Sequence, residues 1–387
     1  MVSCHGRAGT GRVPSGARLA PRRWLPGVLV LGSLAGCGGS AVAPAPGNAA
    51  LPELVALAPV TGIDGLSPRS RIAIDGEGGW LFAAPRLSQS ALVLVEPDGR
   101  QQPIGGVGEG PGEARFAVPM RLVGDSVVGF DLATRRLIVW GRDGRFVESH
   151  EAGRDALPLL WPLGEHLLAM RSGPGGRIPV LVDPTSGESM APISVDDSLY
   201  RALFAAGSSV SARPATAVLG TWRGGVVIGD GARFTFGLYQ ADGRLHTVID
   251  RDLPDRHRSP AEVERLLTAA RDAGMITGGE AGVAAERRRL AEEPVPWVSG
   301  PSHPRSDGDG RLWILRATEA DSVVAAEIFA DGTHLGTVAL TCPGFAGEWA
   351  LAADRLALVC APLDEASPDD AELRRYRIVG AGGSGAR

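Results

Sequence analysis

Short apolar segments, separated by turns rich in Asp and Gly, recur along most of the chain. Asp-Gly between two apolar runs is a strong signal for a tight β-hairpin, because glycine readily adopts the positive φ that the turn needs. Such turns follow the runs 91–95 and 136–140, and their Asp-Gly pairs lie 45 residues apart. Others lie at 242–243 and 331–332, and a looser turn begins at Asp183. A spacing near 45 residues is typical of one four-stranded propeller blade.

Each repeating unit also contains a second hairpin ahead of the Asp-Gly hairpin. In the first unit, the segment 72–74 turns through Asp75-Gly-Glu-Gly-Gly79 into Trp80-Leu-Phe82. Two successive hairpins give four short antiparallel strands. The pattern therefore predicts an all-β protein, a six-bladed β-propeller of four-stranded antiparallel blades, whose ring hides most strand edges. The expected blades lie near residues 70–107, 118–152, 157–195, 213–251, 302–341 and 345–380.

The sixth unit is one strand short. It offers only the segments 348–351, 356–360 and 374–379. A spare apolar segment, Leu54-Val-Ala-Leu57, precedes the first blade. We expect this segment to pair as the outer strand of the sixth blade and so to close the ring.

The β pattern stops between the fourth and fifth units, and a short helical insertion is expected at 255–297. Ser259-Pro260 is typical of a helix start, and apolar residues then keep helical spacing up to Gly274. Residues 281–290 predict a second helix. The pair of helices either covers apolar surface at the rim of the ring or caps a binding site at the mouth of the central channel.

The N-terminal residues 1–36 have the features of a secretory signal. Arg22 and Arg23 precede an apolar run, 24–34, which is too short to span a bilayer. The run ends in Leu-Ala-Gly-Cys37, which resembles the lipobox of bacterial lipoproteins. The resemblance implies that Cys37 is lipid-modified and becomes the mature N-terminus. Gly38 after it indicates sorting to the outer membrane, facing the periplasm.

The remaining domain boundaries follow from this assignment. Residues 37–50 are small and Pro-rich, which predicts a flexible tether. The propeller is expected to occupy 51–380, and 381–387 to be a disordered tail. Anchoring through a lipid makes the membrane one expected partner of the protein.

Two cysteines remain in the expected folded part, Cys342 and Cys360. Two thiols in an oxidising compartment predict a disulfide. The expected topology supports it, because Cys342 precedes the inner strand of the sixth blade and Cys360 ends the neighbouring strand. The alternative is two independent buried thiols.

The charge balance limits the possible partners. The chain of 387 residues has a net charge of -5, which argues against a nucleic-acid partner, since nucleic-acid binding needs a basic face. No Lys is present, and this excludes a phosphate-binding loop of the Walker type at the Gly-rich segment 105–112. That segment is interpreted as a connection between blades. Glu109, Glu113 and Arg115 beside it are the candidate binding residues at the channel mouth.

No residue pattern indicates a catalytic centre or a metal site. The chain has no Gly-x-Ser-x-Gly segment, and beyond Cys37 its one Asn is Asn48, in the tether. Asp residues at turns could form an all-carboxylate metal site but are better explained as turn formers. Scattered His residues show no paired spacing. The Asp residues concerned are Asp75, Asp125, Asp131, Asp230 and Asp307, and the His residues are His150, His166, His246, His257, His303 and His334.

Several segments are similar to segments of six-bladed β-propeller lipoproteins (NHL- and TolB-like) of environmental bacteria. They are Gly106-Val-Gly-Glu-Gly-Pro-Gly-Glu-Ala-Arg-Phe-Ala-Val-Pro119, Val127-Val-Gly-Phe-Asp131 with Arg136-Leu-Ile-Val-Trp140, Asp307-Gly-Asp-Gly-Arg-Leu-Trp313 and Arg374-Arg-Tyr-Arg-Ile378. The resemblance covers nearly all of the chain after the tether. It implies a fold and an envelope location more than an activity.

Two functions remain open. The first is a non-catalytic binding or scaffolding propeller of the cell envelope, with a protein, peptide or glycan as partner and no cofactor besides the lipid. The alternative is a divergent propeller hydrolase or lyase with an axial divalent metal. Three or more carboxylates or His residues within metal reach on the axis would favour the enzyme. An apolar or arginine-lined axis would favour binding.

Overall fold

The fold is described from a computed structural model of the chain. The described residues belong to one compact unit, Asn48–Arg387. The predicted signal, Cys37, the tether and the tail all lie outside the described residues. The description covers residues 51–380 except 64, 68–69, 76, 84–89, 152–159, 164–165, 174–175, 183–188, 193–216, 241, 273, 299–302, 319–322, 343–344 and 362–370.

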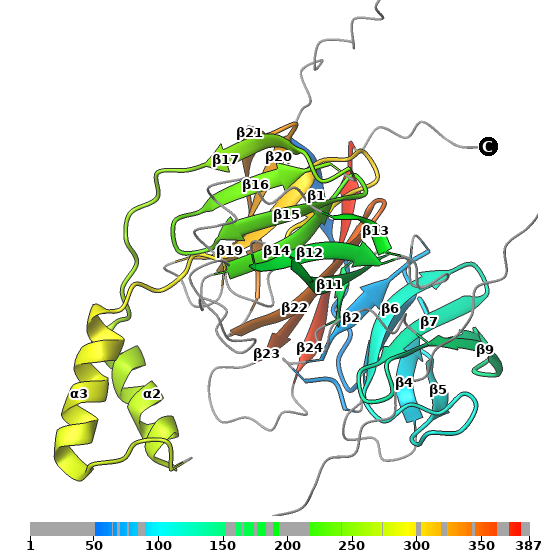
Figure 1. Ribbon diagram of the computed structural model, residues 1–387, viewed down its shortest axis with the longest axis horizontal. Helices are drawn as coiled ribbons and strands as arrows, with labels where there is room; N and C mark the ends of the chain where they lie inside the picture. Colours follow the sequence, from blue (N-terminus) through cyan, green and yellow to red (C-terminus); the bar gives the residue numbers. More distant parts are fainter. Residues whose placement is uncertain are drawn as a thin grey trace, which may run out of the picture. The chain divides into compact units, whose positions relative to one another are not determined.

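The described part of the chain forms six four-stranded antiparallel sheets, which are the blades of a propeller (Figure 1). The first blade contains β2 (Ile72–Ile74), β3 (Trp80–Ala83), β4 (Ser90–Val95) and β5 (Gln101–Gly106). The second contains β6 (Ala117–Val123), β7 (Ser126–Asp131), β8 (Arg136–Gly141) and β9 (Phe146–Glu151). The third contains β10 (Leu160–Leu163), β11 (His166–Gly173), β12 (Gly176–Val182) and β13 (Ser189–Pro192).

The remaining blades follow the same order. The fourth contains β14 (Ala217–Trp222), β15 (Gly225–Asp230), β16 (Thr235–Tyr239) and β17 (Leu245–Asp250). The fifth contains β18 (Arg305–Ser306), β19 (Leu312–Ala317), β20 (Val323–Ala330) and β21 (Thr333–Thr341). The sixth contains β22 (Phe345–Ala352), β23 (Arg355–Ala361), β24 (Glu372–Val379) and β1 (Glu53–Ala56). The six predicted blades are thereby confirmed.

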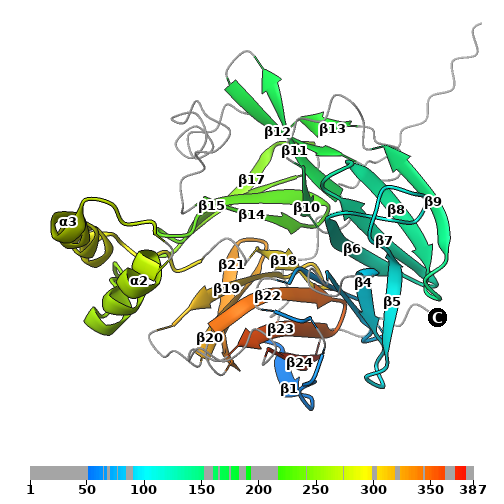
Figure 2. The same cartoon turned by 90° about the horizontal axis from the view of Figure 1, so that it is seen from below.

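The first strand of each blade is its innermost strand. β2 contacts both β6 and β22, β6 contacts β10, and β18 contacts β14 and β22. Figure 2 shows the sheets side by side around a common centre. Because β22 of the last blade contacts β2 of the first, the described strands return to their starting point as the repeat pattern predicts.

The ring is closed by the predicted N-terminal strand. β1 pairs antiparallel with β24 as the outer strand of the sixth blade, with Leu54 opposite Ile378. A further bridge joins Val60 to Leu373. Because the two ends of the propeller share one sheet, the blade cannot form fully unless both are in place.

The core lies between neighbouring blades, because each strand run is apolar on the faces that meet the next sheet. Four tryptophans are fully buried there: Trp80, Trp140, Trp313 and Trp349. Trp80 belongs to a cluster of first- and sixth-blade residues, and Trp140 to a cluster of the first two blades. Replacing a buried aromatic residue of this kind by Ala costs about 3–5 kcal/mol.

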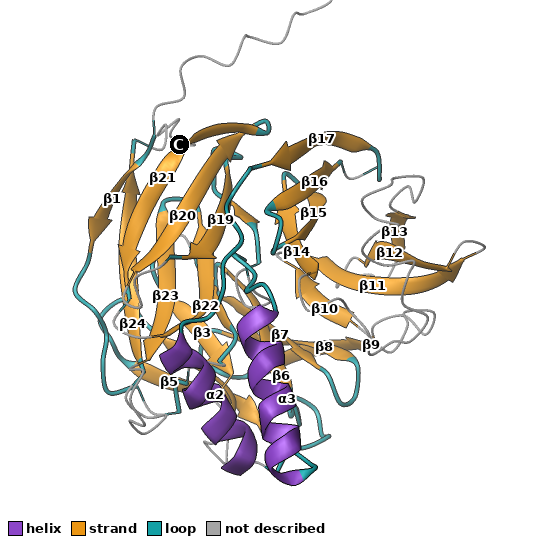
Figure 3. Ribbon diagram, turned by 90° about the vertical axis from the view of Figure 1, so that its left-hand side faces the viewer, coloured by secondary structure: helices purple, strands orange, loops and turns teal. Residues whose placement is uncertain are grey.

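The insertion after the fourth blade contains two helices, α2 (Pro260–Asp272) and α3 (Gly279–Glu292). The Ser259 hydroxyl accepts a hydrogen bond from the Glu262 amide at 3.2 Å, so the predicted helix start is correct. The two helices lie side by side (Figure 3). Val263 and Leu267 of α2 pack on Leu290 of α3, which holds the helices together. Among the residues that the structure describes, neither helix is long and apolar enough to cross a membrane.

The disulfide predicted from the topology is present. Cys342 and Cys360 are bonded, with 5.4 Å between their Cα atoms, and both are fully buried. They lie in the apolar cluster between the fifth and sixth blades. The bond ties the entry to β22 to the end of β23, and it is consistent with an extracytoplasmic location.

Candidate functional site

A pocket of about 580 Å³ lies where the inner strands end. Its size is within the range of small-molecule sites in proteins. Five of the six blades contribute described residues to it, from the ends of β2, β6, β14, β18 and β22 and from the turns that follow. We call it the axial pocket. Its lining includes Ile74, Asp75, Met120, Arg121, Leu122, Arg223, Arg305, Asp307 and Leu351.

The charge of the axial pocket is set by few side chains. Within the printed bounds of the six inner strands, the sequence contains three charged residues, namely Arg121, Arg305 and Glu348. An arginine-bearing axis was the feature expected of a binding propeller. Across the described residues, no group of three or more His, Cys, Asp and Glu side chains could hold a metal ion.

Of the two arginines on the inner strands, Arg121 has no carboxylate partner among the described residues. It lies on β6 between Met120 and Leu122, which are both buried. The Nε atom of Arg121 is buried and has no hydrogen-bond partner among the described residues. A buried guanidinium N–H without an acceptor is costly, and such groups in native proteins call for an explanation.

Arg305 on β18 shares one carboxylate with Arg71. Its Nη2 atom donates to Glu348 Oε1 at 3.1 Å, and Arg71 Nε lies 3.7 Å from Glu348 Oε2. Arg71 also contacts His303, with 3.3 Å between the nitrogen atoms. The Nε atom of Arg305 is buried without a hydrogen-bond partner. Its guanidinium lies 5.5 Å from the ring centre of Trp349, a cation–π contact.

Burial shifts both members of the Arg305–Glu348 pair. It raises the pKa of Glu348, and the nearby positive charges of Arg305 and Arg71 oppose that rise. Burial also lowers the pKa of Arg305, against the attraction of Glu348. Two guanidinium groups thus share one buried carboxylate, and burial disfavours the charged form of both Glu348 and Arg305.

The carboxylates at the rim of the axial pocket have partners of their own. Asp307 accepts hydrogen bonds from Arg311 Nε at 2.7 Å and from Trp313 Nε1 at 2.9 Å. Arg223, a rim arginine, forms an ion pair with Asp331. These groups therefore do not neutralise Arg121 or Arg305.

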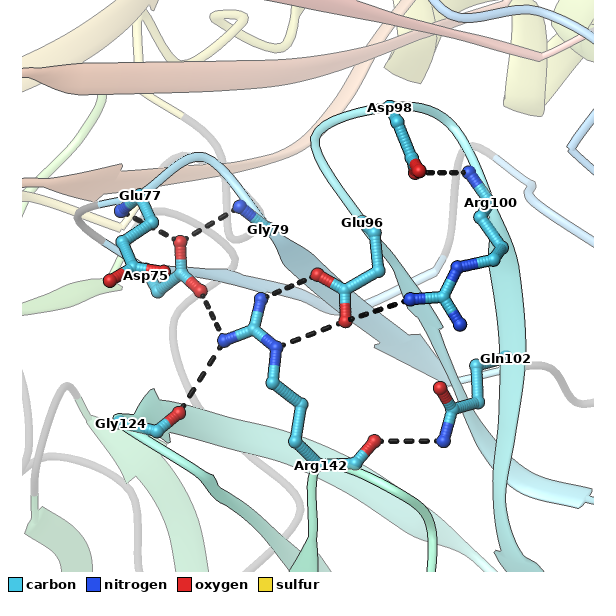
Figure 4. A network of polar contacts seen from close by, with 9 residues as sticks. All are labelled: Asp75, Glu77, Gly79, Glu96, Asp98, Arg100, Gln102, Gly124 and Arg142. Carbon is cyan, nitrogen blue, oxygen red and sulfur yellow. Dashed lines mark hydrogen bonds and ion pairs between the residues drawn. The ribbon is translucent and has the colours of Figure 1, made fainter.

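Asp75 belongs to a network between the first two blades (Figure 4). Its Oδ1 atom accepts the amides of Glu77 and Gly79, and its Oδ2 atom accepts from Arg142 Nη1 at 3.0 Å. Arg142 also donates to both oxygens of Glu96, at 3.0 and 2.7 Å. A Cβ atom at Gly79 would lie 2.6 Å from Arg142 Nη2, so the junction requires glycine there.

A second carboxylate network joins the fourth and fifth blades. Glu327 on β20 is fully buried and accepts from Arg316 Nε at 2.6 Å and from Thr337 Oγ1 at 2.8 Å. Arg251 and His334 also contact it. Burial raises the pKa of Glu327, but hydrogen bonds from Arg316 and Thr337 and the charges of both arginines outweigh it, so the pKa is below its ordinary value.

The residues predicted for the channel mouth lie elsewhere. Glu109 and Arg115 form an exposed ion pair of 3.0 Å, and Glu113 accepts the Gly110 amide at 2.8 Å. None of the three lines the axial pocket. Glu113 lines a second, open pocket of about 780 Å³, which also includes Trp140 and Phe146 among its lining. Their observed contacts shape the connection between blades, and a ligand role for them stays a prediction.

Four of the five aspartates considered for a metal site, Asp75, Asp131, Asp230 and Asp307, accept backbone amides of their own turns. Asp131 accepts the amides of Phe116 and Ala133, and the Thr134 hydroxyl at 2.6 Å. Asp230 accepts the Ala232 amide at 2.9 Å. Burial raises the pKa of Asp131, yet its four hydrogen bonds outweigh burial and lower it. Among the described His residues, His150 lies near Glu148 and His246 near the ring of Trp222, whereas His303 and His334 make the contacts given above.

Two roles were open for the helical insertion, a cover of apolar surface at the rim and a cap over a binding site, and the described contacts show no cap over the axial pocket. No residue of α2 or α3 is among the described lining residues. The insertion is attached through its ends, where Trp297 Nε1 donates to the Pro254 carbonyl and the Val298 amide to that of Gly231. Within the described part of the chain, the helices pack on each other and not on the pocket.

Sequence reasoning missed Arg121, Arg305, Glu348 and Arg71 as site residues. A usable signal was present: each lies in or beside the first strand of a repeat, and first strands face the axis of a propeller. The sequence does not show which of these charged side chains form ion pairs with one another.

Comparisons with known proteins give weak likenesses. No protein-family model matches the chain, and no curated protein matches it. A member of the DUF4221 family from Bacteroides vulgatus has 11% identity and a TM-score of 0.46, over 84% of this chain and 98% of that protein. A Bacteroides fragilis protein thought to be exported has 11% identity and a TM-score of 0.45, over 84% and 95%. The PQQ-bound aldose sugar dehydrogenase of Streptomyces coelicolor has 13% identity and a TM-score of 0.43, over 85% and 99%. The fold assignment therefore rests on the strand pairing of this chain.

Proposed function

We propose that the protein is a non-catalytic binding β-propeller of the bacterial cell envelope whose ligand or partner enters the axial pocket. The observation that carries the proposal is the arginine-bearing lining of this pocket. Arg121 lines the pocket, and no described residue accepts a hydrogen bond from its guanidinium. Donors held ready on rigid strands favour binding because little order has to be gained when a ligand arrives.

The location in this proposal rests on the sequence and on the disulfide. The signal-like residues 1–36 and Cys37 imply export and a lipid anchor, here in the outer membrane and facing the periplasm. The buried Cys342–Cys360 bond fits an oxidising compartment. In cells fed an alkyne-bearing fatty acid, the wild type is expected to incorporate the label and Cys37→Ser is not. Equal labelling of the two proteins would contradict the anchor.

Filling the pocket tests the binding function. Ala352 lines the axial pocket at the end of β22, and Ala352→Trp places a large ring in it. Thermal unfolding of the full chain is measured with a panel of sugars, peptides and organic acids. At least one compound is expected to raise the unfolding temperature of the wild type and not that of the variant.

The matched control is Ala281→Trp, on the exposed face of α3. It introduces the same side chain away from the pocket and should keep the ligand response of the wild type. Bound metal that copurifies with the protein and supports hydrolysis of a panel compound would instead favour the metal-dependent hydrolase. The binding proposal is contradicted if no compound raises the unfolding temperature of the wild type, or if every compound that does so also raises that of Ala352→Trp.

A further inference from the structure

We infer that the ligand of the axial pocket is a small organic carboxylate, bound by the guanidinium groups of Arg121 and Arg305. This inference rests on the proposed function, since it names the class of ligand for the same pocket. Its basis is the charge of the pocket, the free donors on it and the character of its walls.

The charge argument compares each arginine with its partners. Among the described residues, Asp75 and Glu96 share Arg142, Asp307 and Asp309 share Arg311, and Arg223 pairs with Asp331. On the inner strands themselves, Arg121 and Arg305 stand against one carboxylate, Glu348, so one positive charge remains over. An anion is the ligand that compensates such an excess, and a desolvated charge pair binds most strongly when its hydrogen bonds are also made.

Among the described residues, the Arg121 guanidinium has no hydrogen-bond acceptor, and because its Nε atom is buried, its terminal Nη–H groups are the donors left to the pocket. The two Nη–H groups of a guanidinium form a planar fork that matches the two oxygens of a carboxylate. Arg305 is also held in place, because Glu348 accepts its Nη2–H and Trp349 stacks on it.

The walls favour an organic ligand over an inorganic anion. Ile74, Met120, Leu122 and Leu351 line the same pocket. These side chains offer contact to an apolar group of the ligand but no hydrogen bonds. A phosphate group carries more charge and more acceptor oxygens than two free donors can satisfy, so a carboxylate on an apolar group fits the pocket better.

Fluorine NMR on the full-length protein in detergent tests this inference with matched probes. 4-Fluorobenzoate and 4-fluorobenzamide have nearly the same shape and differ in charge, and 4-fluorophenyl phosphate tests the other anion. The carboxylate is expected to bind about tenfold or more tightly than the amide, since a charged hydrogen bond is lost with the amide. Equal binding of carboxylate and amide, or tighter binding of the phosphate, would overturn the inference.

Variants then locate the binding. Arg121→Met keeps the length of the side chain and removes its charge, and it should weaken 4-fluorobenzoate about tenfold or more. Arg121→Lys should recover part of the loss, because it restores a charge but not the fork. Arg145→Met is the control; this exposed arginine lines the second pocket and should leave binding unchanged. Unchanged binding in Arg121→Met would contradict the assignment.

Two sources of the carboxylate remain to be distinguished. A dipeptide that ends in 4-fluorophenylalanine is compared with its C-terminal amide, beside 4-fluorobenzoate. Selective binding of the free dipeptide acid indicates a peptide terminus, and preference for 4-fluorobenzoate indicates a free organic acid. The neutral probes can also bind to the wild type, lose their binding in Ala352→Trp and keep it in Arg121→Met. In that case the pocket binds ligands, but the carboxylate inference is wrong. If no probe binds in a way that Ala352→Trp removes, the proposed function itself fails.

Discussion

Arginines serve two different purposes in this propeller, at the junctions between blades and on the axis. At the junctions, Arg142 reaches Asp75 and Glu96, and Arg251 and Arg316 reach Glu327. Each of these guanidinium groups meets a carboxylate from its own or the neighbouring blade. On the axis, Arg121 has no acceptor for its Nε–H among the described residues. We infer that arginines paired with carboxylates hold the blades together, whereas the unpaired Arg121 serves to bind a ligand.

Energetics explain why the two groups should respond differently to mutation. Removing one member of a buried, hydrogen-bonded ion pair leaves the other charge unpaired and costs several kcal/mol. Removing a buried charge that has no partner relieves a desolvation cost instead. Stability measurements on single variants therefore test the comparison directly.

The largest effect is expected at Glu327. Glu327→Gln leaves Arg316 and Arg251 without their buried counter-charge and should lower the free energy of unfolding by about 3 kcal/mol. Urea unfolding at neutral pH measures it. Glu264→Gln removes one side of an exposed pair with Arg287 and should leave the urea midpoint unchanged. Similar midpoints for the wild type and Glu327→Gln would refute a structural role for this network.

Arg142 should give the next largest loss. Arg142→Met leaves the mostly buried carboxylates of Asp75 and Glu96 without their shared donor, at a cost of about 2 kcal/mol. The same denaturant titration applies, with Arg145→Met as the control because Arg145 is 87% exposed. If Arg142→Met lowers the free energy of unfolding no more than Arg145→Met does, the network in Figure 4 adds no stability.

The junction networks should also weaken in acid. The pKa of Glu327 is below its ordinary value near 4.5, so its stabilising effect is complete above that value and is lost as the pH falls through the folded-state pKa. The stability difference between the wild type and Glu327→Gln should therefore shrink below pH 4.5. Urea midpoints of both proteins along a pH series measure this. A difference that grows toward acid pH would reverse the assigned direction.

The smallest effect is expected on the axis. Arg121→Met removes a charge with no described partner, so stability should stay the same or rise by up to about 1 kcal/mol. Measured beside Arg142→Met, this variant sharpens the contrast between the two classes of arginine. If Arg121→Met lowers the free energy of unfolding as much as Arg142→Met does, Arg121 is a structural arginine and the proposed difference between the two classes is wrong.

Much of the architecture was readable from the sequence. Asp-Gly turns and apolar runs located all six blades, and the missing strand of the last blade pointed to Leu54 and its neighbours. The disulfide followed from the same topology. These features depend on local turn chemistry and on a repeat, and both are written in consecutive residues. The position of the two helices in the sequence could also be predicted from consecutive residues. Their packing away from the axial pocket could not.

The sequence by itself determined the strand pattern, the blade number, the closing strand and the bonded cysteines. Only the tertiary structure decided which arginines are neutralised. Arg142 finds Asp75 across 67 residues, and Arg223 finds Asp331 across 108. Such partners come from neighbouring blades that are far apart in the sequence, so no local pattern records them. Charge compensation depends on distances of a few ångströms between blades, and those distances exist only once the ring has closed.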